Sequence, residues 1–290
     1  MQAFLYYLFL PFIYGFSLLP FPIIYFVSDI LYYVLFYILK YRRDTIYSNL
    51  TNSFPDKSKA EIEVIAKQYY RYFCDLTLET FKSLTISKEE AIKRCHLADN
   101  RLMNQWHAEG KKMILVMGHY GNWEWAGTTI SLNTNYPFYI IYRPLHNPYF
   151  DRLVNKMRTR FGSKMVPMKG TLRHMASHKA EAIATVFVGD QTPEAEFAYW
   201  TTFLNQETPI FVGTEKIAVK FNDPVVYAWI ERVKRGYYLM HYKLLVAEPA
   251  TTVEGEITKL HTSLLEQQIL KIPQYWLWSH KRWKHKRNIN

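Results

Sequence analysis

The sequence has few cysteines and none of the short motifs that mark common metal or nucleotide sites. Its two cysteines, Cys74 and Cys95, form no CxxC pair, which argues against a zinc ribbon and a disulfide framework and fits a reducing cytosolic setting. There is no Gly-rich phosphate loop, no HExxH motif and no GxSxG elbow. A phosphate-binding loop, a zinc-peptidase site and a serine-hydrolase triad are therefore not indicated.

Charged side chains are nearly absent from the first forty residues. Between Ala3 and Leu39 only Asp29 carries a formal charge, and this stretch exceeds the roughly 20 helical residues that cross a bilayer core. Pro20 and Pro22 divide it into two segments, which we interpret as one transmembrane helix plus one interfacial helix. The basic residues that follow directly place the body on the cytoplasmic side. A signal peptide fits less well, because no Lys or Arg precedes the apolar stretch; a buried pair of soluble helices is the other alternative.

Positive charge and aromatic residues are abundant. The net charge is +11, from 36 basic and 25 acidic residues, and 17% of the residues are aromatic. Such a surface attracts an anionic partner, and the aromatic content favours a membrane interface over nucleic acid. Residues 273–287 combine Trp276, Trp278 and Trp283 with Lys, Arg and His, which predicts contact with anionic headgroups. A solvated basic tail and single-strand binding are the alternatives.

The rest of the chain predicts an α/β fold, a central mostly parallel or mixed sheet flanked by helices. Residues 58–84 show helical spacing and begin with the capping box Ser58 and Glu61. Beyond them, short apolar runs predict strands at residues 113–117, 138–142, 183–188, 225–230 and 237–245, and helices at 147–161, 169–179 and 211–221. There is no internal repeat or low-complexity segment. We therefore predict a membrane anchor at residues 1–40 and one domain at residues 41–290.

Polar residues follow three of the predicted strands. The first strand is followed by residues 118–124 (GHYGNWE), the second ends in residues 142–144 (YRP), and the third is followed by residues 189–191 (GDQ). The carboxyl ends of parallel strands meet at one edge of a sheet, where open α/β sheets bind ligands. The sequence therefore predicts that these three motifs form one site.

His119 and Glu124 form the most specific pattern in that site. On one continuous helix they would lie about 140° apart and share no face. Gly118 and Gly121 supply a turn, and Asn122 can cap a helix that begins after it, so the imidazole can contact the carboxylate. A carboxylate that fixes the tautomer of a His prepares it as a general base. A structural polar pair at a strand end is the alternative.

These residues resemble the bacterial lipid A biosynthesis (late) acyltransferase family, a branch of the lysophospholipid acyltransferases. Residues 118–124 are similar to its signature, a His followed after four residues by an acidic residue. Further similar motifs, in family order, are residues 19–22 (LPFP), 42–43 (RR), 49–50 (NL), 54–55 (FP), 142–151 (YRP, NP and D), 190–191 (DQ), 213–214 (GT) and 273–283 (PQYWLWSHKRW). Residues 203–205 (FLN) depart from the two Phe and a Gly found in many relatives, at the acyl-chain pocket.

The resemblance implies that His119 is the general base and Glu124 its partner, and that Arg143 and Asp190 are site residues. We expect Arg143, held extended by the following proline, to bind a phosphate or a developing oxyanion, and Asp190 to orient Arg143 or a sugar hydroxyl. A buried ion pair between these two residues is the alternative. We also place Asn122 and Gln191 among the substrate-binding residues.

The implied reaction moves a fatty acyl group from an acyl carrier protein thioester to the hydroxyl of a hydroxyacyl chain on a lipid A precursor. It would take place at the cytoplasmic face of the inner membrane, without a metal or an organic cofactor and without nucleic acid. The same chemistry on another glycolipid, a lysophospholipid or an aminolipid is an alternative. A lipid-binding scaffold without activity is the alternative from another class.

Overall fold

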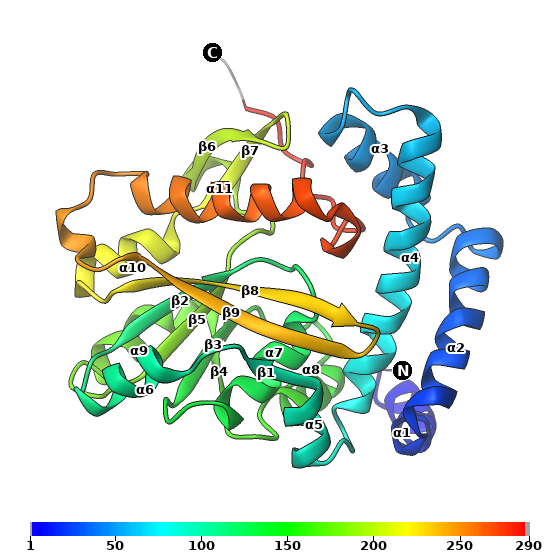
Figure 1. Ribbon diagram of the computed structural model, residues 1–290, viewed down its shortest axis with the longest axis horizontal. Helices are drawn as coiled ribbons and strands as arrows, with labels where there is room; N and C mark the ends of the chain where they lie inside the picture. The colour runs from blue at the N-terminus through cyan, green and yellow to red at the C-terminus, as the bar shows by residue number, and fades with distance from the viewer. Residues whose placement is uncertain (1, 288–290) are drawn as a thin grey trace.

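The apolar runs of the chain form a seven-stranded sheet in the computed structural model, which describes residues 2–287 (Figure 1). The strands lie in the order β1 (Cys95–Leu97), β9 (Tyr237–Val246), β8 (Val225–Lys234), β2 (Met113–Met117), β5 (Ala184–Val188), β3 (Phe138–Tyr142) and β4 (Lys164–Pro167). β8 and β9 form an antiparallel hairpin, and the other neighbouring strands pair in parallel. The predicted mixed, mostly parallel sheet is confirmed.

Alternate residues of β2 face two hydrophobic layers, because successive side chains of a strand point to opposite faces. Ile114 and Val116 belong to the layer that contains α11, and Met113, Leu115 and Met117 to the layer that contains α6 and α7. The helices of the body are α5 (Lys88–Arg94), α6 (Arg101–Ala108), α7 (Trp123–Thr129), α8 (Pro148–Arg158), α9 (Thr171–Ser177), α10 (Gly213–Phe221) and α11 (Glu256–Lys271). All predicted strands and helices are present, with ends that differ by up to four residues.

A separate hairpin of β6 (Ala198–Phe203) and β7 (Gln206–Phe211) lies against α11 (Figure 1). Its two turn residues, Leu204 and Asn205, have positive φ angles of 50° and 61°, the backbone of a tight two-residue turn. Phe203 and Leu204 are buried. The residues that depart from the family pattern therefore form the tip of this hairpin, which the sequence did not predict.

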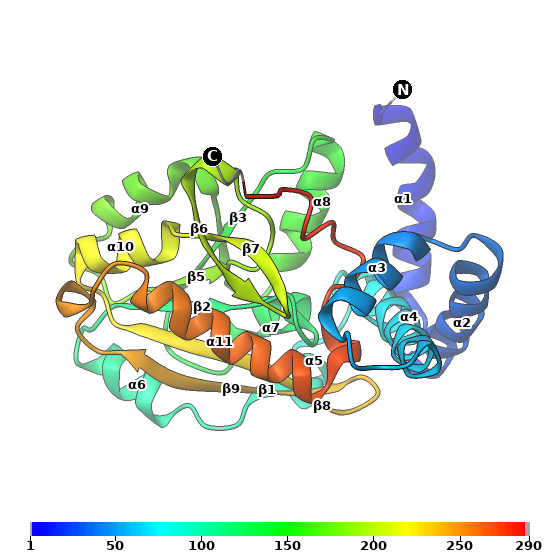
Figure 2. The same cartoon turned by 90° about the horizontal axis from the view of Figure 1, so that it is seen from above.

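Four helices form the N-terminal part of the chain (Figures 1 and 2). They are α1 (Gln2–Leu18), α2 (Phe21–Tyr33), which continues into a π-helical turn (Val34–Ile38), α3 (Arg43–Ser53) and α4 (Lys59–Lys82). The Ser58 and Glu61 capping box at the start of α4 is confirmed. Residues 21–38 are long and apolar enough to cross a membrane, with a mean hydropathy of 1.7. This stretch is the candidate transmembrane span of the described chain.

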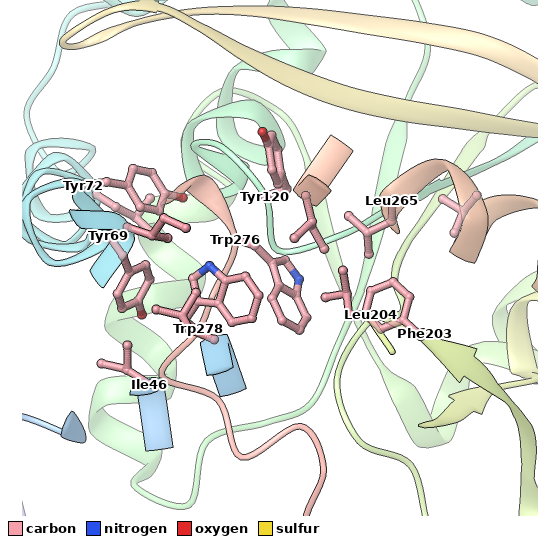
Figure 3. Close-up of a cluster of buried hydrophobic side chains, with 14 of the residues drawn as sticks. Ile46, Tyr69, Tyr72, Tyr120, Phe203, Leu204, Leu265, Trp276 and Trp278 are labelled. Carbon is pink, nitrogen blue, oxygen red and sulfur yellow. The ribbon is translucent and has the colours of Figure 1, made fainter. Parts of the chain in front are cut away.

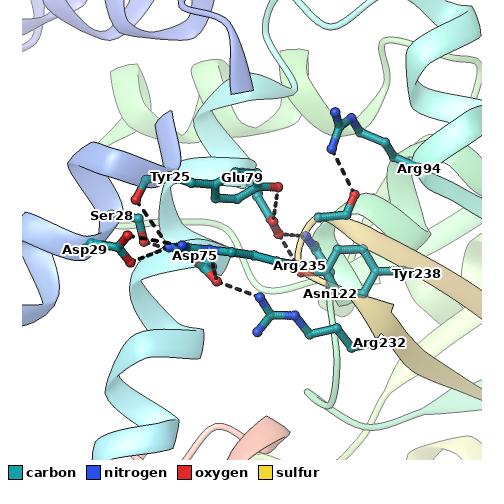
Figure 4. A network of polar contacts seen from close by, with 11 residues as sticks. Tyr25, Ser28, Asp29, Asp75, Glu79, Arg94, Asn122, Arg232, Arg235 and Tyr238 are labelled. Carbon is teal, nitrogen blue, oxygen red and sulfur yellow. Dashed lines mark hydrogen bonds and ion pairs between the residues drawn. The ribbon is translucent and has the colours of Figure 1, made fainter. Parts of the chain in front are cut away.

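A polar network joins α2 to the body (Figure 4). Tyr25 donates a hydrogen bond to Glu79 (2.8 Å) and Ser28 donates to Asp75 (2.7 Å), both acceptors lying on α4. Asp29 pairs at 2.7 Å with Arg235 in the β8–β9 turn. These three residues of α2 occupy one face of the helix, so α2 is fixed along its polar side.

Two of the three tryptophans near the C-terminus lie inside the protein, and the third is partly buried. Trp276 and Trp278 are buried beside the β6–β7 hairpin, α11 and α4 (Figure 3), and the indole of Trp283 donates to the hydroxyl of Thr208 at 2.7 Å. For Trp276 and Trp278 the predicted contact with lipid headgroups is wrong, whereas Trp283 is only partly buried. Aromatic rings alternating with basic residues have the same pattern whether the rings face lipid or a core, so the sequence could not separate the two cases.

Candidate active site

The loop that carries His119 follows β2 and has glycine at two positions of close approach. A Cβ on Gly118 would lie 2.6 Å from a methyl carbon of Leu265 on α11. Gly121 has a φ of +63°, and its Cβ would lie 2.8 Å from the Cβ of Ile230 on β8. Both contacts are closer than a normal Cβ contact: at Gly118 the end of the Leu265 side chain would have to move, and at Gly121 the positive φ adds backbone strain. The loop therefore passes tightly between α11 and the sheet.

Hydrogen bonds from two sides hold the backbone of the same loop. The hydroxyl of Tyr72 on α4 donates to the carbonyl of Gly121 at 2.5 Å, and the Gly121 N–H donates to the carbonyl of Tyr275 at 3.0 Å. Tyr120 and Trp276 form an antiparallel bridge. Because α4 and the C-terminal segment hold the loop, the position of the intervening backbone is fixed before any substrate binds.

Asn122 begins α7 as predicted. Its side-chain oxygen accepts the N–H of Trp125 at 2.9 Å, and its amide donates to Glu79 at 2.7 Å. The side chain is completely buried. Both ends of its amide therefore support the loop and the cap, and its predicted contact with substrate stays a prediction.

Asp190 lies beside His119 because β5 pairs with β2 in parallel. Nδ1 of His119 is 2.5 Å from Oδ1 of Asp190, and the His119 backbone N–H donates to Oδ2 at 2.8 Å. The indole of Trp276 also donates to Oδ2, at 2.7 Å. Burial raises the pKa of the Asp190 carboxyl, but His119 and these hydrogen bonds outweigh it and hold the pKa well below its usual range. Asp190 is therefore a carboxylate at neutral pH.

The other ring nitrogen of His119 faces outward from this pair. The Nε2 atom lies 3.3 Å from the side-chain amide of Gln191, and the ring packs edge-on to Trp123. A carboxylate at Nδ1 favours the tautomer with its proton there, which leaves a lone pair on Nε2. This is the arrangement of a general base oriented by a carboxylate.

Glu124 stands in the first turn of α7, as predicted, but its contact is different from the one predicted. The guanidinium of Arg158, at the end of α8, binds it with two hydrogen bonds of 2.9 Å and 2.5 Å. Burial raises the pKa of Glu124, and the charge of Arg158 outweighs this and lowers it overall, with a further contribution from His119. In this structure Asp190, not Glu124, bonds to the imidazole, and Glu124 acts on His119 only through its charge.

Arg143 follows β3, and the strand order β2, β5, β3 places it at the same edge of the sheet as His119 and Asp190. The predicted common edge for the three motifs is confirmed. Arg143 is exposed, and within residues 2–287 it has no hydrogen bond or ion pair. Asp190 does not pair with Arg143 among the described residues, since its carboxylate bonds to His119 and Trp276. The other expected role of Asp190, orienting a sugar hydroxyl, stays a prediction.

Two residues of the site were not predicted. Arg158 lies in an ordinary helical segment without any motif, and Trp276 lies in a segment interpreted as lipid-facing. Both lie far from their partners in the chain, so only the folded arrangement reveals them. Among the residues that the structure describes, no three His, Cys, Asp or Glu side chains are grouped so that they could hold a metal ion.

Comparison with known proteins identifies the family of the chain. The family described as "Bacterial lipid A biosynthesis acyltransferase" matches residues 1–285. The chain belongs to this family.

Among curated relatives of this acyltransferase family, a lipid A biosynthesis acyltransferase of Haemophilus influenzae is 23% identical over 245 residues, covering 82% of this chain and 74% of the relative. The lipid A biosynthesis palmitoleoyltransferase of Escherichia coli is 21% identical over 280 residues, covering 92% of this chain and 86% of the relative. Membership of the family supports an acyltransferase that acts in lipid A biosynthesis.

Proposed function

We propose that the protein transfers a fatty acyl group from an acyl carrier protein thioester to the hydroxyl of a hydroxyacyl chain on a lipid A precursor. The observation that carries this proposal is the contact of His119 Nδ1 with Asp190 at 2.5 Å, with Nε2 directed outward toward Gln191. Acyl transfer from a thioester to an alcohol requires a base of this kind and a donor set for negative charge.

In the proposed reaction Nε2 of His119 takes the proton of the acceptor hydroxyl as its oxygen attacks the thioester carbonyl. The tetrahedral intermediate then expels the thiolate of the carrier, and the imidazolium returns the proton to that sulfur. The products are an ester and a free carrier thiol, and the base regains its starting state. Asp190 stabilises the imidazolium between the two steps, while Glu124, paired with Arg158, adds negative charge nearby.

Two features near the base suit the proposed substrates. Arg143 presents an exposed cation at the same edge of the sheet, where it can bind a phosphate of a glycolipid. The C-terminal segment exposes four basic residues, Lys281, Lys284, Lys286 and Arg287. Together with the net charge of +11, they offer an acidic carrier protein a favourable docking field.

We further propose that the protein is attached to the cytoplasmic face of the inner membrane, and exposed apolar side chains on α1 and α2 support attachment to a membrane. Phe12 on α1 is 71% exposed and Phe26 on α2 is 66% exposed, which is unfavourable in water. Residues 21–38 are long and apolar enough to cross a membrane, and Tyr6–Leu18 is shorter. Because Asp29 on α2 binds Arg235 of the body, we nevertheless place α2 flat in the interface and assign membrane insertion to α1. This keeps the two charges of that pair at the surface of the bilayer and out of its core.

The test is an acceptor panel with the purified full-length protein. Acyl carrier protein thioester is incubated with a lipid A precursor, another glycolipid, a lysophospholipid and an aminolipid, and products are read by mass spectrometry. We expect an added acyl chain on the lipid A precursor and none with His119→Ala. Transfer only to another acceptor would change the substrate, and lipid binding without transfer to any acceptor would favour a scaffold role.

A further inference from the structure

A small cavity adjoins the His119–Asp190 pair. Its volume is about 10 Å³, enough for one water-sized molecule. The residues that line it and bear on its chemistry are Gly118, Asp190, Tyr227, His261, Leu265 and Arg282. They come from the ends of β2 and β5, from β8 and α11, and from the C-terminal segment. The cavity is therefore next to the carboxylate that orients the base.

Arg282 is a buried cation whose hydrogen-bonding capacity is mostly unused by the protein. Its side chain is 1% exposed, and one terminal nitrogen donates to the carbonyl of Pro209 at 2.7 Å. Within the described residues, Nε and Nη1 have no hydrogen-bond partner. Burial lowers the pKa of Arg282 to about 10 and Asp190 opposes that shift, so the guanidinium is charged at neutral pH. Leaving buried charged donors unpaired costs several kcal/mol.

Two further groups at the same cavity have unused acceptor capacity. His261 on α11 is buried, and its Nε2 atom has no partner in the described part of the chain. Burial lowers the pKa of His261 to about 4, so the ring is neutral at pH 7 and one nitrogen carries a lone pair. Asp190 has about four acceptor positions, and His119 and Trp276 occupy three of them.

We propose that this cavity binds an ordered water molecule that accepts hydrogen bonds from Arg282 and donates hydrogen bonds to Asp190 and His261. A water has two acceptor and two donor positions, and these three residues use all four. An anion would satisfy Arg282 but would be repelled by Asp190. Arg282 is then a positioning residue, which acts on His119 through the water and the carboxylate.

The pH dependence of the reaction reports this role. The charged or titratable side chains around the His119–Asp190 pair are Glu124 and Arg158 from α7 and α8, Tyr227 from β8, His261 from α11, and His280 and Arg282 from the C-terminal segment. The charge of Arg282 opposes protonation of the imidazole. Without it, the imidazolium is more stable, and the acidic limb of kcat/KM moves to higher pH.

The first test concerns the unmodified protein and needs no activity. A crystal structure of the full-length chain, at a resolution that shows waters, should contain one peak within hydrogen-bond distance of both Arg282 and Asp190. A cavity that is well ordered but without such a peak would overturn the water site, and so would density for an apolar chain there. Because no variant is needed, a folding failure does not leave the proposal untested.

The second test rests on the proposed acyl transfer and compares pH profiles. Arg282→Met should shift the acidic limb of kcat/KM upward by about 0.5 to 1 unit, whereas Arg282→Lys, which keeps the charge, should restore most of the wild-type profile. Lys259→Met, at an exposed position of α11, controls for the loss of one positive charge. If Arg282→Met lowers activity but leaves the acidic limb of kcat/KM at the wild-type pH, Arg282 has a structural role only. Absence of acyl transfer by the wild-type protein would contradict the proposed function. The crystal structure alone would then decide whether the water site exists.

Discussion

The indole of Trp276 donates a 2.7 Å hydrogen bond to Oδ2 of Asp190, the carboxylate that contacts His119. This bond connects the C-terminal segment to the Asp190 carboxylate beside His119, across 86 residues of sequence. The segment also holds the backbone of Gly121 through Tyr275. It is therefore part of the support of the site and not a detached basic tail.

Asp190 should matter more to turnover than Glu124, because only Asp190 bonds to the imidazole. We expect Asp190→Asn to lower kcat by about 10² to 10⁴, since an amide can donate to Nδ1 and favour the wrong tautomer. Glu124→Gln should have the smaller effect. Single-turnover kinetics on both variants decide this, with circular dichroism as the check on folding. An equal or larger loss in Glu124→Gln would contradict the assigned partner and favour a rearranged pair in the substrate complex.

Arg143 is expected to affect binding and not stability. It is exposed and unpaired among the described residues, so Arg143→Ala should change the free energy of unfolding by less than about 0.5 kcal/mol. If it binds a phosphate, KM for a phosphorylated acceptor should rise while KM for the carrier thioester stays the same. Measuring both constants with Arg152→Ala, an exposed arginine on α8, as the control separates a specific contact from general charge. A rise in both constants would argue for carrier docking at Arg143.

Much of the fold could be predicted because its strands have local signals. β2 is buried at all five positions, and such a strand reads as a continuous apolar run between turn residues. The common edge for residues 118–124 and 189–191 followed from that pattern and from parallel pairing. The same pattern did not reveal which carboxylate contacts His119. Asp190 and Glu124 are both carboxylates near the same strand end. In the fold, Arg158 binds Glu124, while the His119 N–H and Trp276 hold Asp190 beside the imidazole.

Gly121 allows a test of how tightly the His119 loop is packed. Gly121→Ala should destabilise the protein by about 1 to 3 kcal/mol, because the new methyl group meets Ile230 and the backbone has a positive φ. Activity should fall as well, since the shift displaces His119. Gly170→Ala is the matched control, because open space surrounds its Cβ position and its φ is not positive. Thermal denaturation of both variants and the wild type gives the comparison; equal stability of the two variants would show that the loop can relax.

Glu79 should make the stability of the protein depend on pH between about 4.5 and 7. It is completely buried on α4 and accepts hydrogen bonds from Tyr25, Asn122 and Tyr238. Burial raises its pKa from 4.5 to about 7, and the hydrogen bonds oppose this shift only in part. In this window the folded protein holds a proton that the unfolded chain has lost. Stability therefore falls as the pH rises toward 7.

Replacing Glu79 with Gln removes that titration and should flatten the dependence. Each unit of raised pKa corresponds to about 1.4 kcal/mol, so wild type and Glu79→Gln should differ in slope by an amount that urea denaturation at pH 5, 6 and 7 resolves. Glu254→Gln, at an exposed position, should keep the wild-type slope.

Because Glu79 binds both α2 and the cap of α7, the Glu79→Gln variant also tests whether α2 and the His119 loop share one support. If α2 and the loop share this support, Glu79→Gln should lower activity. Tyr25→Phe removes only the hydrogen bond between Glu79 and α2, so it should lower activity less. Full activity in Glu79→Gln with a flattened slope would separate the stability role from any support of the base.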